Sequence, residues 1–141
     1  MTPAWAAARA AAEELIHRYA DAVRRRDAAA AAELFLADGV FEIHDEPPGG
    51  EARLRARLSG RAEIQTYVER SIAAGPVAPC IANFTFDLAQ GGDEARARCL
   101  MTAILWPDGA RLVGAYDDRL ARTPDGWRFA RRRYAILGRF P

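Results

Sequence analysis

The first quarter of the chain places its apolar residues at helical spacing. They recur every three or four positions, at Trp5, Ala8, Ala12, Leu15, Ile16, Tyr19 and Val23. This period predicts a helix from about Pro3 to Arg26 with one buried face. Asp27 is suited to the N-cap or first turn of a second helix, from Ala28 to about Ala37, which ends at the Asp38–Gly39 turn signal.

Shorter patterns follow the two helices. Val40–His44 has the composition of a short strand and precedes a Pro- and Gly-rich loop. Arg53–Leu58 alternates charged and apolar residues, which suits an extended edge or a loop. Gly60–Arg70 again has helical spacing and predicts a third helix with Ile64, Tyr67 and Val68 facing inward.

Beyond Pro79 the pattern becomes that of strands separated by Gly- and Pro-containing turns. The four runs are Cys80–Gln90, Ala95–Trp106, Arg111–Thr123 and Trp127–Leu137. Helices followed by a long antiparallel meander predict an α+β fold, with a curved sheet wrapped around the three helices. The absence of a repeat or a composition shift predicts one domain over residues 1–141.

Charge and composition exclude several kinds of chemistry. The 20 basic residues are all Arg and face 19 acidic ones, a net charge of +1, which argues against nucleic acid as a partner. Without Lys, a Schiff base, a phosphate-loop lysine and a Ser–Lys dyad are excluded. Two His and two Cys at unsuitable spacing do not make a closed zinc site. We therefore expect no metal and no organic cofactor.

Targeting signals are not evident in this sequence. The N-terminal segment lacks a basic start followed by an apolar run. The longest uncharged stretch, residues 71–86, is short and broken by Gly75, Pro76 and Pro79. We expect a cytoplasmic protein with reduced thiols and no membrane partner.

Four short segments, in order along the chain, resemble sequences of a known family. They are Arg18–Asp27, Glu33–Phe41, Gly60–Ile64 and Gly114–Phe129, and together they span most of the chain. This arrangement resembles the nuclear-transport-factor-2-like superfamily, in its SnoaL-like and ketosteroid-isomerase-like branch. The resemblance implies a cone-shaped, cystatin-like α+β barrel with a deep apolar pocket, often in a dimer. Isomerases, dehydratases, cyclases and plain binding domains share this fold, so the fold alone does not settle the function.

Tyr19 and Asp118 are the first two candidate catalytic residues. Tyr19 lies on the apolar stripe of the first helix, and the resemblance implies that its hydroxyl donates to an oxyanion; the alternative is a core tyrosine bonded to the backbone. Strand alternation places Gly114, Tyr116 and Asp118 on one face, predicted to be inward. A buried Asp118 would have a raised pKa and act as a neutral donor, unless it pairs with an arginine.

His44 is the third candidate, as the proton shuttle. Counted without gaps from Tyr19, the catalytic Asp that the resemblance implies falls on Ile43. Glu42 and His44 share one face of the strand, and Phe41 and Ile43 share the other. Either a shift of one residue brings His44 or Glu42 into the cone, or no base lies there and His44 is a surface residue.

Another active-site scheme implied by the resemblance pairs an Asp on the first helix with a His at the first long strand. Arg24 and Cys80 occupy those two places, and an arginine is not a base at neutral pH. Cys80 is therefore predicted to be a small apolar residue of the pocket. The predicted pocket wall consists of Phe35, Phe41, Tyr67, Cys80, Phe84, Met101 and Tyr116.

Three functions fit these residues. The first is a cofactor-independent isomerase, dehydratase or cyclase that acts on a small apolar or ring-containing molecule through an enolate, with Tyr19, Asp118 and His44 around one void. The second is a non-catalytic ligand-binding or dimerisation module, favoured by Arg24 and Cys80. The third, an accessory subunit of an oxygenase, is disfavoured by the short chain. The resemblance further implies a homodimer formed through the sheet.

Overall fold

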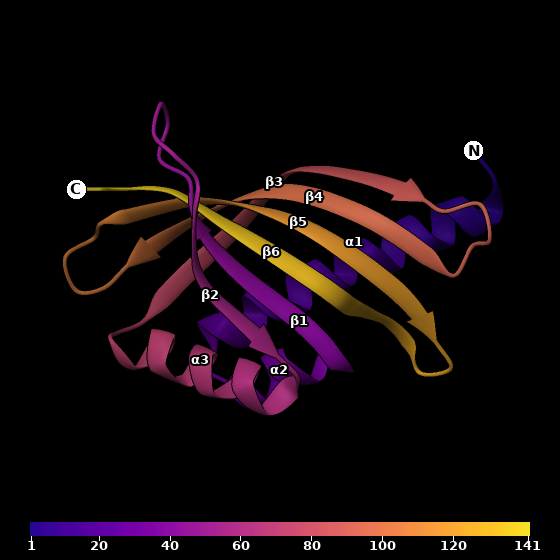
Figure 1. Ribbon diagram of the computed structural model, residues 1–141, viewed down its shortest axis with the longest axis horizontal. Coiled ribbons are helices and arrows are strands. Elements are labelled where there is room, and N and C mark those ends of the chain that lie inside the picture. Colours follow the sequence, from indigo (N-terminus) through magenta and orange to yellow (C-terminus); the bar gives the residue numbers. More distant parts are fainter.

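A computed structural model describes all 141 residues as three helices on one side of a six-stranded sheet (Figure 1). The helices are α1 (Pro3–Arg24), α2 (Ala28–Glu33) and α3 (Arg61–Ala73). The strands are β1 (Phe35–Asp45), β2 (Arg53–Ser59), β3 (Val77–Leu88), β4 (Glu94–Leu105), β5 (Arg111–Thr123) and β6 (Gly126–Phe140). The predicted α+β class is confirmed.

The sheet is curved and does not close into a barrel. Its strand order is β2-β1-β6-β5-β4-β3. All neighbours pair antiparallel except β1 and β6, which run parallel. The predicted antiparallel meander is observed for β3 to β6. The sequence did not predict the parallel pairing of the first strand, β1, with the last strand, β6. Figure 1 shows α1 lying along one face of the sheet, with α2 and α3 near one end.

The second helix ends earlier than its alanine content predicts. Asp27 caps it as expected, accepting a hydrogen bond from the Ala30 amide at 3.0 Å. The helix stops at Glu33 because the chain then enters the sheet. The Phe129 amide donates to the Leu34 carbonyl at 2.9 Å, and Phe35 pairs with Phe129 across β1 and β6.

Helix α1 packs against β3 and β6, and the middle of its predicted stripe is buried, whereas Trp5 and Val23 near its ends are only partly buried. Thr2 caps it through the Trp5 amide at 3.1 Å, and Pro3 occupies the first turn, where no backbone donor is needed. Ile16 and Tyr19 are buried against inward residues of the sheet. No helix in the protein has the length and hydropathy needed to span a bilayer.

An aromatic cluster joins α1 to strands β1 and β6. The ring of Tyr19 meets the rings of Phe35, Phe41 and Phe129 edge-on, with centroids 6.1–6.3 Å apart. Phe35 and Phe129 are completely buried. Such edge-to-face pairs add about 0.5–1.5 kcal/mol each beyond the burial of their area, so this cluster fixes where Tyr19 points.

Candidate ligand-binding site

A cavity of about 670 Å³ lies between the two long helices and the concave face of the sheet. Of its 25 lining residues, 17 are hydrophobic, and they come from α1, α3, all six strands and the β4–β5 turn. A space of this size and composition matches the usual site of a small organic ligand. The open end is rimmed by the β4–β5 turn, with Trp106 and Asp108, and by the segment after α3.

All four tyrosines of the chain line this one cavity. Tyr19 comes from α1, Tyr67 from α3, Tyr116 from β5 and Tyr134 from β6. Tyr19 and Tyr116 are buried, with 5% and 7% of their surface exposed, which confirms both predicted positions. The tyrosines therefore provide most of the polar chemistry inside an otherwise apolar space.

Tyr134 owes its place to a glycine on the neighbouring strand. A Cβ atom built on Gly114 would lie 2.3 Å from Cε1 of Tyr134, closer than two non-bonded carbon atoms can approach. The tyrosine ring fills the space that a side chain would occupy and packs on Tyr116, with centroids 4.9 Å apart. Its hydroxyl is buried and has no hydrogen-bond partner within the protein.

Asp118 lies inside the fold, as strand alternation predicts, but it does not reach the cavity. It is completely buried, and Oδ1 lies 3.2 Å from Nε of Arg132, which is completely buried as well. Neither residue lines the cavity. The alternative left open from the sequence, an Asp paired with an arginine, is the one observed, and the role of Asp118 as a donor to a ligand is wrong.

The two charges are joined without aligned hydrogen bonds. Both carboxylate oxygens of Asp118 and all three guanidinium nitrogens of Arg132 lack a hydrogen-bond partner. The guanidinium instead stacks on aromatic faces: its Cζ lies 3.5 Å from the ring centroid of Tyr116, 4.4 Å from that of Tyr19 and 4.5 Å from that of Phe129. Contacts of a cation with ring faces are worth about 0.5–2 kcal/mol each.

Burial changes the proton affinities of this group. It raises the pKa of Asp118 to about 7; Arg132 opposes this effect, and Asp117 adds to it. Burial likewise raises the pKa of Tyr116 to about 12 and holds that of Tyr19 above its usual range, while Arg132 lowers both. At neutral pH the tyrosines are therefore hydrogen-bond donors, and no tyrosinate forms.

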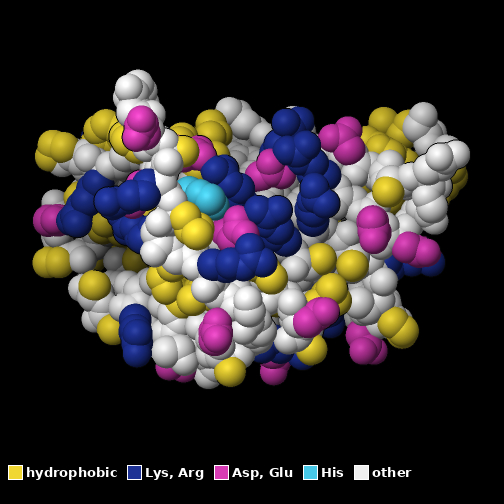
Figure 2. Space-filling model, viewed as in Figure 1, with side chains coloured by type: hydrophobic (Ala, Val, Ile, Leu, Met, Phe, Trp, Pro, Cys, Tyr) yellow, Lys and Arg dark blue, Asp and Glu magenta, His cyan; other side chains and the backbone are white.

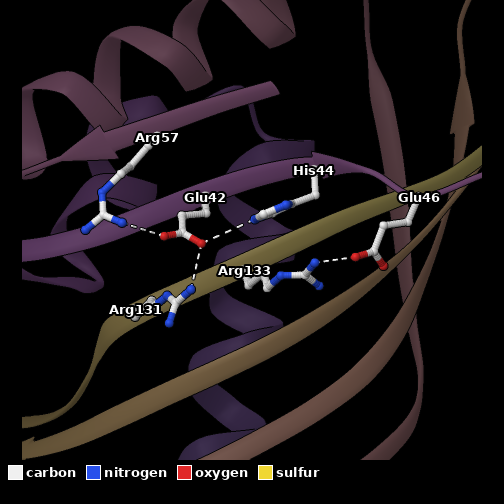
Figure 3. A network of polar contacts seen from close by, with 6 residues as sticks. All are labelled: Glu42, His44, Glu46, Arg57, Arg131 and Arg133. Atoms are coloured by element: carbon white, nitrogen blue, oxygen red, sulfur yellow. Dashed lines mark hydrogen bonds and ion pairs between the residues drawn. The ribbon is translucent and has the colours of Figure 1, made fainter. Parts of the chain in front are cut away.

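His44 points away from the cavity, so its predicted role in proton transfer is wrong. Its Nε2 lies 3.2 Å from Oε1 of Glu42 on the outer face of the sheet, where Arg131 and Arg57 also donate to Glu42 at 2.7 and 2.8 Å (Figure 3). Arg133 pairs with Glu46 beside them. Figure 2 shows arginine and acidic side chains gathered on this face. The register keeps Phe41 and Ile43 inward, and no shift brings His44 or Glu42 into the cone.

Four of the seven predicted wall residues line the cavity: Phe41, Tyr67, Met101 and Tyr116. The other three do not. Phe35 belongs to the core beneath it, and Phe84 stacks on Phe86 under the guanidinium of Arg9. Cys80 is exposed, because its neighbours Pro79 and Ile81 occupy the inward positions of β3.

The charged residues near the cavity are at its edges and are already paired. Arg55 donates to Asp45 at 2.6 and 3.1 Å, and Arg139 donates to Asp108 at 2.9 Å. Arg24, at the position where the resemblance implies an Asp, is exposed on α1 and paired with Asp21. No group of three or more His, Cys, Asp or Glu side chains is placed to hold a metal ion.

The sequence left two important residues unassigned. Arg132 is the middle residue of an Arg131–Arg133 run, and alternation indicates that it faces opposite to its neighbours, but not whether that side is the interior. Tyr134 shares its face, two positions further along β6. The signal available for Tyr134 is Gly114, which lies in the adjacent strand and leaves room for a large ring.

The curved sheet, the three covering helices and the apolar cavity define a domain of the nuclear-transport-factor-2-like class with a cystatin-like fold. Within this class the chain belongs to the SnoaL-like family, whose domain model matches residues 5–133. A search of curated proteins finds no significant match.

Solved structures with the same fold cover nearly the whole chain. An NTF2-like protein from Novosphingobium aromaticivorans is 30% identical, with a TM-score of 0.74 over 92% of this chain and 82% of its own. A provisionally assigned aromatic ring hydroxylase from the same organism is 25% identical, with a TM-score of 0.73 over 98% and 93%. A provisionally assigned scytalone dehydratase, also from this organism, has a TM-score of 0.79 over 99% and 90%, but only 21% identity, so it supports the fold alone.

Proposed function

We propose that this protein is a SnoaL-like domain that binds a small, ring-containing, mainly apolar molecule in the cavity between its helices and its sheet. The observation that carries the proposal is the cavity itself: about 670 Å³, mostly hydrophobic, with all four tyrosines of the chain on its wall. Flat aromatic surfaces stack well on a planar ligand, and the hydroxyls supply a few polar contacts.

The binding function is favoured over acid–base catalysis by the residues that the cavity lacks. Proton transfer through an enolate requires a base within reach of the ligand, at a pKa suited to neutral pH. Asp118 is enclosed with Arg132, and His44 lies on the opposite face of the sheet. The one carboxylate on the lining, Asp108, lies at the rim, is paired with Arg139, and has a lowered pKa, chiefly because the Ala110 amide donates to it.

Calorimetric titration with a panel of fused-ring compounds tests this proposal. Tetralin, decalin and the corresponding ketones fit the volume, and we expect dissociation constants in the micromolar range for the best of them. Leu112→Trp should weaken binding at least tenfold, because Leu112 lines the cavity and the larger ring fills it.

Leu54→Trp is the matched control, because Leu54 is about half exposed on β2 and does not line the cavity. This variant should bind as the unmodified protein does. If no compound binds, or if both variants lose binding equally, the cavity is not the site and the proposal is wrong.

A further inference from the structure

A positive charge that the binding proposal does not use lies behind the cavity wall. Arg132 is completely buried, and removing a guanidinium from water costs several kcal/mol. Its hydrogen-bonding nitrogens find no aligned partner, so the arginine is not held there by a hydrogen-bond network. Besides Asp118, it contacts the ring faces of Phe129 and of two tyrosines that form part of the cavity wall, Tyr19 and Tyr116.

We propose that Arg132 determines the ligand specificity of this cavity: stacked on Tyr19 and Tyr116, it strengthens their hydroxyls as hydrogen-bond donors, so that the preferred ligand is a ring compound with a carbonyl oxygen. The inference rests on the proposed function, because it assigns the polar group of the ligand that the cavity binds.

The physical basis is the field of the guanidinium on the two rings. A cation against the face of a phenol draws electron density from the ring and makes the O–H bond more polar. The effect is strong here because the surroundings are apolar and exclude water. No hydrogen bond within the protein engages the hydroxyl of Tyr19 or Tyr116, so both are free to donate to a ligand.

A carbonyl group fits this arrangement better than a hydroxyl or an amine. A carbonyl oxygen only accepts, and the interior wall offers donors but no carboxylate to receive a ligand's proton. Tyr134 adds a third buried hydroxyl without a partner. A hydrocarbon of the same shape would leave these donors unpaired, which is the usual source of discrimination between such ligands.

Asp118 opposes the electric field of Arg132, so the proposal predicts in which direction the ligand affinity changes when Asp118 gains or loses its proton. When Asp118 is ionised, its charge offsets that of the guanidinium 3.2 Å away; when it is neutral, the full positive charge acts on the tyrosines. The titratable groups that act on Asp118 or respond to its charge are Arg132 on β6, Cys99 on β4, Tyr19, Tyr116 and the adjacent Asp117, which points to the outer face and pairs with Arg96. Asp117 has a lowered pKa, and burial raises those of Cys99 and Tyr116 to about 11 and about 12, so Asp118 is the group expected to titrate near neutrality.

The experiment compares α-tetralone with tetralin, which has the same two rings without the oxygen, at pH 8.5 and pH 5.5. For the unmodified protein, we expect α-tetralone to bind about three- to tenfold more tightly at pH 5.5, with tetralin unchanged. In the Asp118→Asn variant, the side chain is neutral at every pH. Its affinity for α-tetralone at pH 8.5 should therefore equal that of the unmodified protein at pH 5.5. The carbonyl stretching band of bound tetralone should move to lower frequency in step with these affinities, a signature that a merely structural role of the pair would not produce.

A double variant, Asp118→Leu with Arg132→Met, removes both charges and keeps the space behind the cavity wall apolar, a replacement that proteins commonly tolerate at a buried ion pair. It should bind both compounds, with a preference for tetralone that is about three- to tenfold smaller than that of the unmodified protein at pH 5.5 and that no longer changes with pH. If tetralone and tetralin respond alike to pH and to both variants, or if the carbonyl band does not move, the role of Arg132 is wrong, while the binding function stands. If neither compound binds the unmodified protein, both proposals fail.

Discussion

Asp118 and Arg132 form the least solvated ion pair of the protein, and their burial determines what each can do. A carboxyl group enclosed in an apolar site keeps its proton to a higher pH than it does in the unfolded chain. At pH values between the pKa of Asp118 in the unfolded chain and its raised pKa in the folded protein, the folded protein therefore binds more protons than the unfolded chain does. Stability measured against pH reports this difference directly.

The Asp118→Asn variant should lose this dependence. Because burial raises the folded-state pKa of Asp118 to about 7, its contribution favours the folded state below the unfolded pKa and is lost as pH rises through 7. Between pH 5 and pH 8, the unmodified protein should lose about 2 kcal/mol of unfolding free energy relative to Asp118→Asn. Urea unfolding of both proteins at several pH values measures this, and parallel curves would contradict it.

At the residue scale, the sequence predicts which face a side chain lies on but not what it meets there. Alternation placed Asp118 and Tyr116 inward and Glu42 with His44 on one face. It did not show that Arg132, 14 positions further along the chain, would enclose Asp118, because that pairing depends on the register between β5 and β6.

At the element scale, the helices and the four long strands follow from periodicity and turn signals. The exceptions are pairings between distant parts of the chain. The parallel contact of β1 with β6 extends β1 back to Phe35 and shortens α2, and hydrophobic period alone carries no information about a partner so far away. The shape of the cavity also depends on contacts between strands, above all on the close packing of Tyr134 on β6 over Gly114 on β5.

Gly114→Ala tests that packing. The added methyl group would lie 2.3 Å from Cε1 of Tyr134 and 3.1 Å from the Ala135 carbonyl oxygen, so the ring must move. We expect a loss of about 1–3 kcal/mol in unfolding free energy, measured by urea unfolding, and weaker ligand binding. Gly91→Ala is the control, because a methyl group there meets nothing within 4 Å. Equal stability of the two variants would show that Tyr134 is not held by the space above Gly114.

At the scale of the whole molecule, the two faces of the sheet have different chemistry. The inner face and the helices enclose an apolar cavity, and the outer face carries a network of arginine and carboxylate side chains around Glu42 (Figures 2 and 3). The homodimer expected through the sheet stays a prediction. The account of function rests on the inner face, because the tyrosines, Arg132 and the cavity all lie on that side.

The position of the ligand is tested most directly by NMR of the protein labelled with ¹³C in the methionine methyl groups. The chain has two methionines: Met101 lines the cavity and is 4% exposed, whereas Met1 is 96% exposed and serves as an internal control. On titration with α-tetralone, we predict that the Met101 methyl signal shifts and shows contacts with the ligand's protons, while the Met1 signal does not move. Binding that leaves the Met101 signal unchanged would contradict the central claim that the four-tyrosine cavity is the ligand site.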